Sequence, residues 1–278
     1  GNRVIRVHQA STSSPFYVNA GITDSGRRYR MDTYANSNGP YAAFGGVNNI
    51  GGGVAFWKWT SAIQPDSVWN TPAFELLDST VILLTPSVDG SEINLPKVVF
   101  DSASPKVNVT AAAGEAYASS LVRKGRGMLN LLGGGSGSVL RDAPADRLFV
   151  RNGAPAVVNG MVAPYLLNNT YFVTYDETFG FDSAAFDFTN DINAQDPNAI
   201  HSVTSQQTLT DDNVIHALRT SSSIDGSGHT LTVNSGGVIF AGGTPTISSA
   251  VDFGEAEAII HNAVAATLAG KLTGKNGA

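Results

Sequence analysis

Two tryptophans placed two residues apart are the side chains whose type and spacing best suit ligand binding. They occur in "GVAFWKWTS" as Trp57 and Trp59. Alternate residues of a strand share a face, so if Val54 and Phe56 point inward, the two indoles stand ~7 Å apart on the outside. Exposed indoles at this spacing can stack on sugar rings, which makes Trp57 and Trp59 the candidate carbohydrate-binding residues.

The segment after these tryptophans offers an alternative arrangement. It reads "IQPDSVWNTPAF" and carries Trp69 and Phe74. If it folds down over the strand, the two indoles become part of a covered apolar cluster instead of a binding surface. The sequence leaves both arrangements open.

Aspartates offer a second chemistry, because glycoside hydrolysis uses two carboxyl groups ~5 to 9.5 Å apart, one of them with a raised pKa. The densest group of acids along the chain is Asp187, Asp191, Asp211 and Asp212. Asp187 alternates with Phe186 and Phe188 on a short strand, so we expect it to face solvent. Since no spacing brings two of these acids together, we expect no catalytic residue. A polysaccharide lyase or hydrolase is the alternative.

The other polar motifs predict no metal and no cofactor. The five histidines lack the i, i+4 spacing that places two imidazoles on one helix face, and the chain has no cysteine. The stretches "SIDGSGHT" and "TNDINAQDPN" gather oxygen ligands near turns but match neither the EF-hand loop nor the calcium-binding nonapeptide. The glycine-rich stretches match no phosphate-loop pattern.

Charge and hydropathy exclude two further classes of partner. The net charge of −6 argues against nucleic acid, whose binding depends on Lys and Arg neutralising phosphates. The two local basic groups, interpreted as solvated turns, are Arg27, Arg28 and Arg30, and Arg123, Lys124 and Arg126. No apolar run approaches ~18 residues, so we expect no insertion into a membrane.

The elements that must position these side chains are short strands. Only 14% of the residues are charged, and 30 glycines are present, a composition that favours strands and tight turns. Short alternating runs recur, such as "HTLTVN", in which Leu231 and Val233 share one face. One short helix is expected, near residues 213–218.

Strands of this kind build either an antiparallel sandwich or a parallel β-solenoid, and periodicity alone fits both. Two-residue Asn-Gly and Asp-Gly hairpin turns are scarce, which weakens the case for the sandwich. With ~20 to 25 residues per coil, a solenoid of this length makes roughly a dozen coils. Its expected core includes Leu231, Val233, Val238, Phe240, Val251 and Phe253.

The most distinctive stretch is "LVRKGRGMLNLLGGG", residues 121–135. Gly125 and Gly127 let the backbone turn sharply without Cβ clashes, while Leu129 and Leu131 share the inward face of the next strand. The basic residues of the turn then project outward. The pattern predicts the corner of a coil and not a phosphate-binding loop.

Extended to "AYASSLVRKGRGMLNLLGGG", this stretch resembles the autotransporter-associated β-strand repeat, also called the passenger-associated transport repeat. The core of that repeat runs approximately G-L-x-K-x-G-x-G-x-L-x-L-x-G. The matching positions are Leu121, Lys124, Gly125, Gly127, Leu129, Leu131 and Gly133. Ser120 stands where the pattern has its first glycine. A second, partial repeat at 229–278 ends in "LTGKNGA", which is similar to the T-G-x-N-G that leads into the core pattern.

The resemblance implies an all-β, right-handed parallel β-helix in a large exported bacterial protein, extracellular or at the bacterial cell surface. We therefore expect residues 1–278 to form a single β-solenoid segment with a repeat seam near 121–135. The expected function is a non-catalytic structural or adhesive segment. The alternative is a β-helix that binds or cleaves carbohydrate, and surface polysaccharide is accordingly an expected partner.

The two ends of the sequence bear on self-association. Terminal coils of a solenoid expose unpaired strand edges, so natural ones carry a polar cap or a covering helix. Neither feature is visible in "GNRVIRV" or in "LTGKNGA". Neighbouring repeats of a longer chain cover the open ends, or copies of the chain itself do so in a head-to-tail contact that can build a filament. Both alternatives are open.

Overall fold

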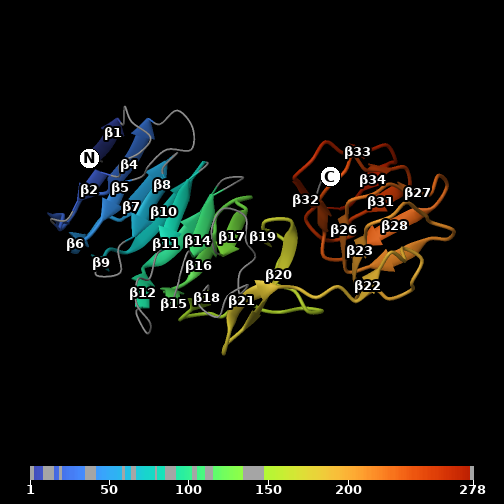
Figure 1. Cartoon of the computed structure of the whole chain (residues 1–278), viewed down its shortest axis with the longest axis horizontal. Helices are drawn as coiled ribbons and strands as arrows, with labels where there is room; N and C mark the ends of the chain where they lie inside the picture. The colour runs from blue at the N-terminus through green and yellow to red at the C-terminus, as the bar shows by residue number, and fades with distance from the viewer. Residues whose placement is uncertain are drawn as a thin grey trace. The chain divides into compact units, whose positions relative to one another are not determined.

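The computed structural model describes residues 3–8, 16–18, 21–34, 42–57, 60–63, 67–78, 80–84, 92–101, 105–109, 115–133 and 147–275. Within these residues the protein is all β, and its stacked parallel strands form a β-solenoid of about nine turns (Figure 1). The chain divides into two compact units. Unit 1 comprises Gly1–Pro155 and Tyr175–Asp182, and unit 2 comprises Ala156–Thr174 and Ser183–Ala278. The single segment expected over 1–278 stays a prediction.

Unit 1 consists of coils with three strands each, and most strands pair in parallel with the strand three elements further along the chain. The first face contains β1 (Arg3–His8), β4 (Tyr29–Tyr34), β7 (Val54–Trp57), β10 (Ala73–Leu77), β13 (Lys97–Phe100) and β16 (Leu121–Arg123). The second contains β2 (Phe16–Val18), β5 (Ala42–Phe44), β8 (Thr60–Ile63), β11 (Val81–Leu84), β14 (Lys106–Val109) and β17 (Leu129–Gly133). The third contains β3 (Thr23–Asp24), β6 (Val47–Ile50) and β9 (Val68–Asn70), followed by a sheet of β12 (Glu92–Leu95), β15 (Glu115–Ala118) and β18 (Arg147–Val150).

Unit 2 repeats this three-strand coil. Its first sheet contains β22 (Phe188–Thr189), β23 (Ile200–Val203), β26 (Ala217–Thr220), β29 (Gly237–Phe240) and β32 (Ile259–Asn262). The second contains β24 (Gln207–Thr208), β27 (Ile224–Asp225), β30 (Thr246–Ile247) and β33 (Thr267–Leu268). The third contains β25 (Asn213–Ile215), β28 (Thr230–Val233), β31 (Ala250–Asp252) and β34 (Leu272–Thr273). Three further strands precede these coils, namely β19 (Leu166–Asn168), β20 (Tyr171–Asp176) and β21 (Gly180–Ser183). β19 pairs with β20 antiparallel, an exception to the parallel stacking.

The core lies inside the coils, where alternate side chains of each strand stack on their counterparts in the next coil. All six residues expected in the core are at most 2% exposed: Leu231, Val233, Val238, Phe240, Val251 and Phe253. Leu231 pairs with Val251, and Leu218 pairs with Val238, so the apolar columns run in register from coil to coil. The expected parallel pairing and the expected core are both confirmed.

The corner predicted at residues 121–135 is present in its described part, which ends at Gly133. β16 leads into a turn with Gly125 at φ 58°, and β17 follows on a different face. Leu129 and Leu131 are fully buried, as expected. A Cβ on Gly127 would lie 2.5 Å from the carbonyl oxygen of Phe100, so only glycine fits where the corner crosses the preceding coil.

Two expectations about the fold were wrong. The coils number about nine and not a dozen, because the stretch between β18 and β23 contains the β19–β20 pair and several turns in place of regular coils. The short helix expected near 213–218 is instead two strands, β25 and β26. The side-chain amide of Asn213 donates to the carbonyl oxygens of Ile192 (2.6 Å) and Ala194 (3.0 Å), which fixes an extended backbone there.

Candidate functional site

The tryptophan pair lies largely outside the described residues. Trp57 is the last residue of β7, but its side chain is outside the described part, and Trp59 lies outside the described residues altogether. Val54 and Phe56 are buried, as the outward orientation of the indoles requires. Trp57 and Trp59 therefore stay a prediction as carbohydrate-binding residues.

The segment expected to cover the tryptophans contributes its described aromatic residues to the core. Trp69 is 7% exposed in β9, and its ring packs edge-on against Phe74 with centroids 4.9 Å apart. Phe74 in turn contacts Phe56 in the same edge-on geometry at 5.1 Å. These two aromatic side chains form an inner cluster of unit 1.

Three of the four acids expected to be solvated accept hydrogen bonds from backbone amides of unit 2. Asp191 accepts a hydrogen bond from the amide of Asn193 (3.1 Å), and Asp212 accepts one from the amide of Thr230 (2.7 Å). Asp187 is exposed, as expected, and accepts a 3.4 Å bond from the amide of Ile200. Asp211 is exposed as well. Such backbone contacts stabilise turns and the contacts between neighbouring coils.

A small cavity of about 320 Å³ lies beside Asp187 in unit 2. It is lined by Asn159, Gly160, Ala185, Asp187, Asp196 and Asn198. Sequence reasoning did not single out Asp196, since its proximity to Asp187 in the cavity depends on the fold. Nδ1 of the buried His216 lies 3.2 Å from the side-chain nitrogen of Asn159.

Two histidines of unit 2, His201 and His216, are buried. Burial lowers the pKa of His201 and of His216, against the opposing influence of hydrogen bonds and of nearby aspartates. Nδ1 of His201 lies 2.9 Å from the carbonyl oxygen of Asp191, and its ring packs beside Phe188. Burial of this kind favours the neutral imidazole.

A more organised site lies on the third face of unit 1, over β12, β15 and β18. The register places Asn94, Tyr117 and Phe149 in one row across the three strands. Ala116 and Ala118 are fully buried, so this row points outward. The rings of Tyr117 and Phe149 stack with centroids 5.0 Å apart and planes 18° from parallel.

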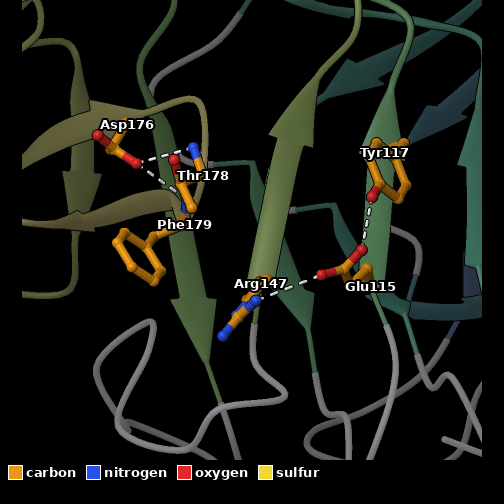
Figure 2. Close-up of polar contacts among 6 residues, drawn as sticks. All are labelled: Glu115, Tyr117, Arg147, Asp176, Thr178 and Phe179. Atoms are coloured by element: carbon orange, nitrogen blue, oxygen red, sulfur yellow. Dashed lines mark hydrogen bonds and ion pairs between the residues drawn. The ribbon is translucent and has the colours of Figure 1, made fainter. Parts of the chain in front are cut away.

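Charged side chains hold the stacked rings in place. The hydroxyl of Tyr117 donates to Glu115 at 2.5 Å, and Arg147 approaches the same carboxylate at 3.4 Å (Figure 2). Partial burial and the adjacent Glu115 raise the pKa of Tyr117 to about 12, so the phenol stays protonated and remains a donor.

Arg151 covers the outer side of this row. Its guanidinium lies 3.9 Å from the centre of the Tyr117 ring and donates to Asn94 (3.1 and 2.8 Å) and to Glu92 (2.8 Å). A guanidinium held by three hydrogen bonds on an aromatic face has little freedom to move. The side chain is nevertheless 46% exposed and available to a ligand.

A hairpin tip from residues 175–182 closes the other side of the site. The carboxylate of Asp176 accepts hydrogen bonds from the amides of Thr178 (2.7 Å) and Phe179 (3.1 Å), which shapes the tip (Figure 2). The hydroxyl of Tyr175 contacts the backbone nitrogen and oxygen of Val150, at 3.1 and 3.3 Å. This packing explains why Phe149 is only 7% exposed although it points outward.

The stack and the hairpin tip together leave a groove of about 640 Å³, which we call the Tyr117 groove. It is lined by Tyr117, Phe149, Val150, Arg151, Gly153, Ala154, Tyr175 and Glu177. Its volume falls within the ~300 to 1,000 Å³ of small-molecule sites, and its lining combines aromatic rings with a few polar groups. Sequence reasoning missed it, because "EAYA" and "RLFVRN" show strands but not the register that joins them.

Comparisons with known proteins add no relative. The chain matches no protein-family model, and neither the curated proteins nor the solved structures compared with it gave a match. The likeness of residues 121–133 to the autotransporter-associated repeat stays an interpretation, with which the β-solenoid is compatible. No helix in the described part of the chain is long and apolar enough to cross a membrane. No group of three or more metal-ligating His, Asp or Glu residues occurs there either.

Proposed function

We propose that the protein is a non-catalytic structural and adhesive β-solenoid segment of an exported bacterial protein, extracellular or at the cell surface. The observation that carries this proposal is the in-register stacking of coils around continuous apolar columns. Each coil contacts mainly its neighbours, so such a fold extends by repetition and presents a long surface. These are the properties that a spacer or an adhesive stalk requires.

The polar residues of unit 2 support the non-catalytic part of the proposal. Three of the four acids considered for glycoside hydrolysis, Asp187, Asp191 and Asp212, bind backbone amides. Burial favours the neutral form of the two buried histidines. General acid–base catalysis needs a group that titrates near the working pH and reaches the substrate. Burial encloses the imidazoles of His201 and His216 and lowers their pKa values, so this arrangement does not favour either histidine as the general acid or base.

The last coil of unit 2 supports self-association or contact with neighbouring repeats. β32, β33 and β34 are the last strands of their sheets within the described residues. Ile260 is 36% and Leu272 is 37% exposed, while Val264 and Leu268 are only partly buried against the core. A further coil stacked on these strands would pair their edges and cover this apolar surface.

Light scattering over a wide concentration range, combined with electron microscopy, tests the assembly. Regular fibres with coils continuous across subunits are the expected result. Uniform monomers at high concentration would contradict self-assembly and leave neighbouring repeats of a longer chain as the partner.

An assay of product release tests the non-catalytic part. We expect no new reducing ends and no unsaturated products when the protein is incubated with a panel of neutral and acidic polysaccharides. Depolymerisation that disappears in Asp187→Asn or Asp196→Asn would instead make the cavity of unit 2 a glycosidic-bond-cleaving site.

A further inference from the structure

We infer that the Tyr117 groove of unit 1 binds a short stretch of a neutral polysaccharide. This inference rests on the adhesive part of the proposed function, which gives the class of ligand, and it adds the site at which that ligand binds. The groove contains the three kinds of group that sugar recognition needs: aromatic surface, fixed hydrogen-bond donors and a free carboxylate.

The aromatic surface comes from Tyr175 and from the edge of Tyr117, because Phe149 and Arg151 cover the two faces of the Tyr117 ring. Both tyrosines are partly exposed at the groove. Each ring is fixed through its hydroxyl group, Tyr117 by Glu115 and Tyr175 by the backbone of Val150. Side chains that are already immobile lose little rotamer entropy on binding, so more of the contact energy appears as affinity. The C–H face of a pyranose suits an amphipathic ring such as that of Tyr175.

The donors come from Arg151. Its hydrogen bonds to Asn94 and Glu92 engage Nε and Nη2. A guanidinium has five N–H groups, and within the described part of the chain the two on Nη1 have no hydrogen-bond acceptor. Since the guanidinium is fixed in place, these two donors have a defined direction for sugar hydroxyl oxygens.

The acceptor is Glu177, an exposed residue at the hairpin tip. A carboxylate accepts bidentate hydrogen bonds, and the two vicinal hydroxyls of a pyranose are suitable donors. Arg151 and Glu177 are the charged residues that line the groove, and Arg151 is also paired with Glu92. The groove therefore offers no net positive charge, which favours a neutral glycan over an acidic one.

Two matched pairs of variants compare a substitution at the Tyr117 groove with a similar substitution in unit 2. Ala154→Trp fills it with an indole, since Ala154 is exposed and lines the groove, and Ala185→Trp places the same indole beside the cavity of unit 2. Glu177→Ala removes the acceptor, and Asp211→Ala removes an exposed carboxylate from unit 2. All four positions are exposed, so each variant should keep the wild-type melting temperature.

Affinity electrophoresis of the full chain tests the inference, with mixed-linkage β-glucan, xylan and galactomannan as neutral probes and polygalacturonate as the acidic probe. We expect retardation by at least one neutral probe. Ala154→Trp should abolish the retardation, and Glu177→Ala should weaken binding about tenfold. Ala185→Trp and Asp211→Ala should behave as wild type.

Three results would overturn the inference: no retardation by any neutral probe, retardation by polygalacturonate alone, or retardation by a neutral probe that Ala154→Trp leaves unchanged. None of them bears on the assembly measured by light scattering. Failure of the groove to bind is thus distinguishable from failure of the proposed structural function.

Discussion

The guanidinium of Arg151 lies 3.9 Å from the centre of the Tyr117 ring, although these residues belong to neighbouring coils of the solenoid. Phe149 stacks on Tyr117 from the same neighbouring coil. These side chains thus connect two coils on the outside of the solenoid, where the apolar core makes no contacts between them. They also shape one wall of the Tyr117 groove.

Removing the Tyr117 hydroxyl should weaken unit 1 measurably. Tyr117→Phe keeps the ring stack but loses the hydrogen bond to Glu115, so the free energy of unfolding should fall by ~1 kcal/mol. Urea titration measures the change. In a double-mutant cycle with Glu115→Gln, the two effects should be non-additive by a similar amount, and strict additivity would show that the bond contributes nothing.

Glycine is required where the hairpin tip meets β18. Gly180 has φ 76°, and a Cβ there would lie 2.3 Å from the carbonyl oxygen of Leu148. Gly153 has a similar φ of 73°, but its Cβ would meet nothing within 4 Å. Gly153→Ala should therefore cost only the backbone strain, ~1 kcal/mol. Gly180→Ala should destabilise unit 1 by ~1 to 3 kcal/mol more. Equal melting temperatures for the two variants would contradict this packing.

The stability of unit 2 should fall as the pH drops below neutral. His201 and His216 have pKa values lowered from 6.5 by burial, so the unfolded state takes up their protons first. Their contribution is fully present above pH 6.5 and is lost as the pH falls towards the folded pKa values, by at most ~1.4 kcal/mol per pH unit for each histidine. Urea titrations at several pH values between 5 and 8 measure the slope.

The same urea titrations on two variants show which histidine causes the pH dependence. His201→Phe should flatten the pH dependence, because it removes one titrating group and keeps an aromatic ring beside Phe188. His229→Gln is the matched control, since the side chain of His229 is 37% exposed. A slope that responds to His229→Gln and not to His201→Phe would contradict the role of the buried imidazole.

The tryptophan pair has a test of its own. If Trp57 and Trp59 contact polysaccharide, replacing both by Ala should abolish retention on a polysaccharide matrix and leave the melting temperature unchanged. A large loss of stability would show instead that the two indoles belong to an apolar cluster, because removal of a buried Trp costs ~3 to 5 kcal/mol.

The fold class and much of the core could be predicted from the sequence, because both depend on local patterns. Alternation in "HTLTVN" placed Leu231 and Val233 inside, and the spaced glycines at 125 and 127 predicted the corner between β16 and β17. Where the local pattern was ambiguous, the prediction was wrong. Residues 213–218 form strands because β25 pairs with β28 and β26 pairs with β23 and β29, all distant in the chain. The side-chain amide of Asn213 adds hydrogen bonds to carbonyl groups about twenty positions earlier.

The sequence by itself determined that the chain builds short strands with one buried face and glycine-dependent corners, since these properties follow from backbone geometry and side-chain alternation. Only the tertiary structure decided which strands lie side by side. Tyr117 meets Phe149 because β15 pairs with β18 in one register, and that register depends on the packing of whole coils and not on any single segment. The Tyr117 groove exists only once that pairing and the hairpin tip at 175–182 are in place.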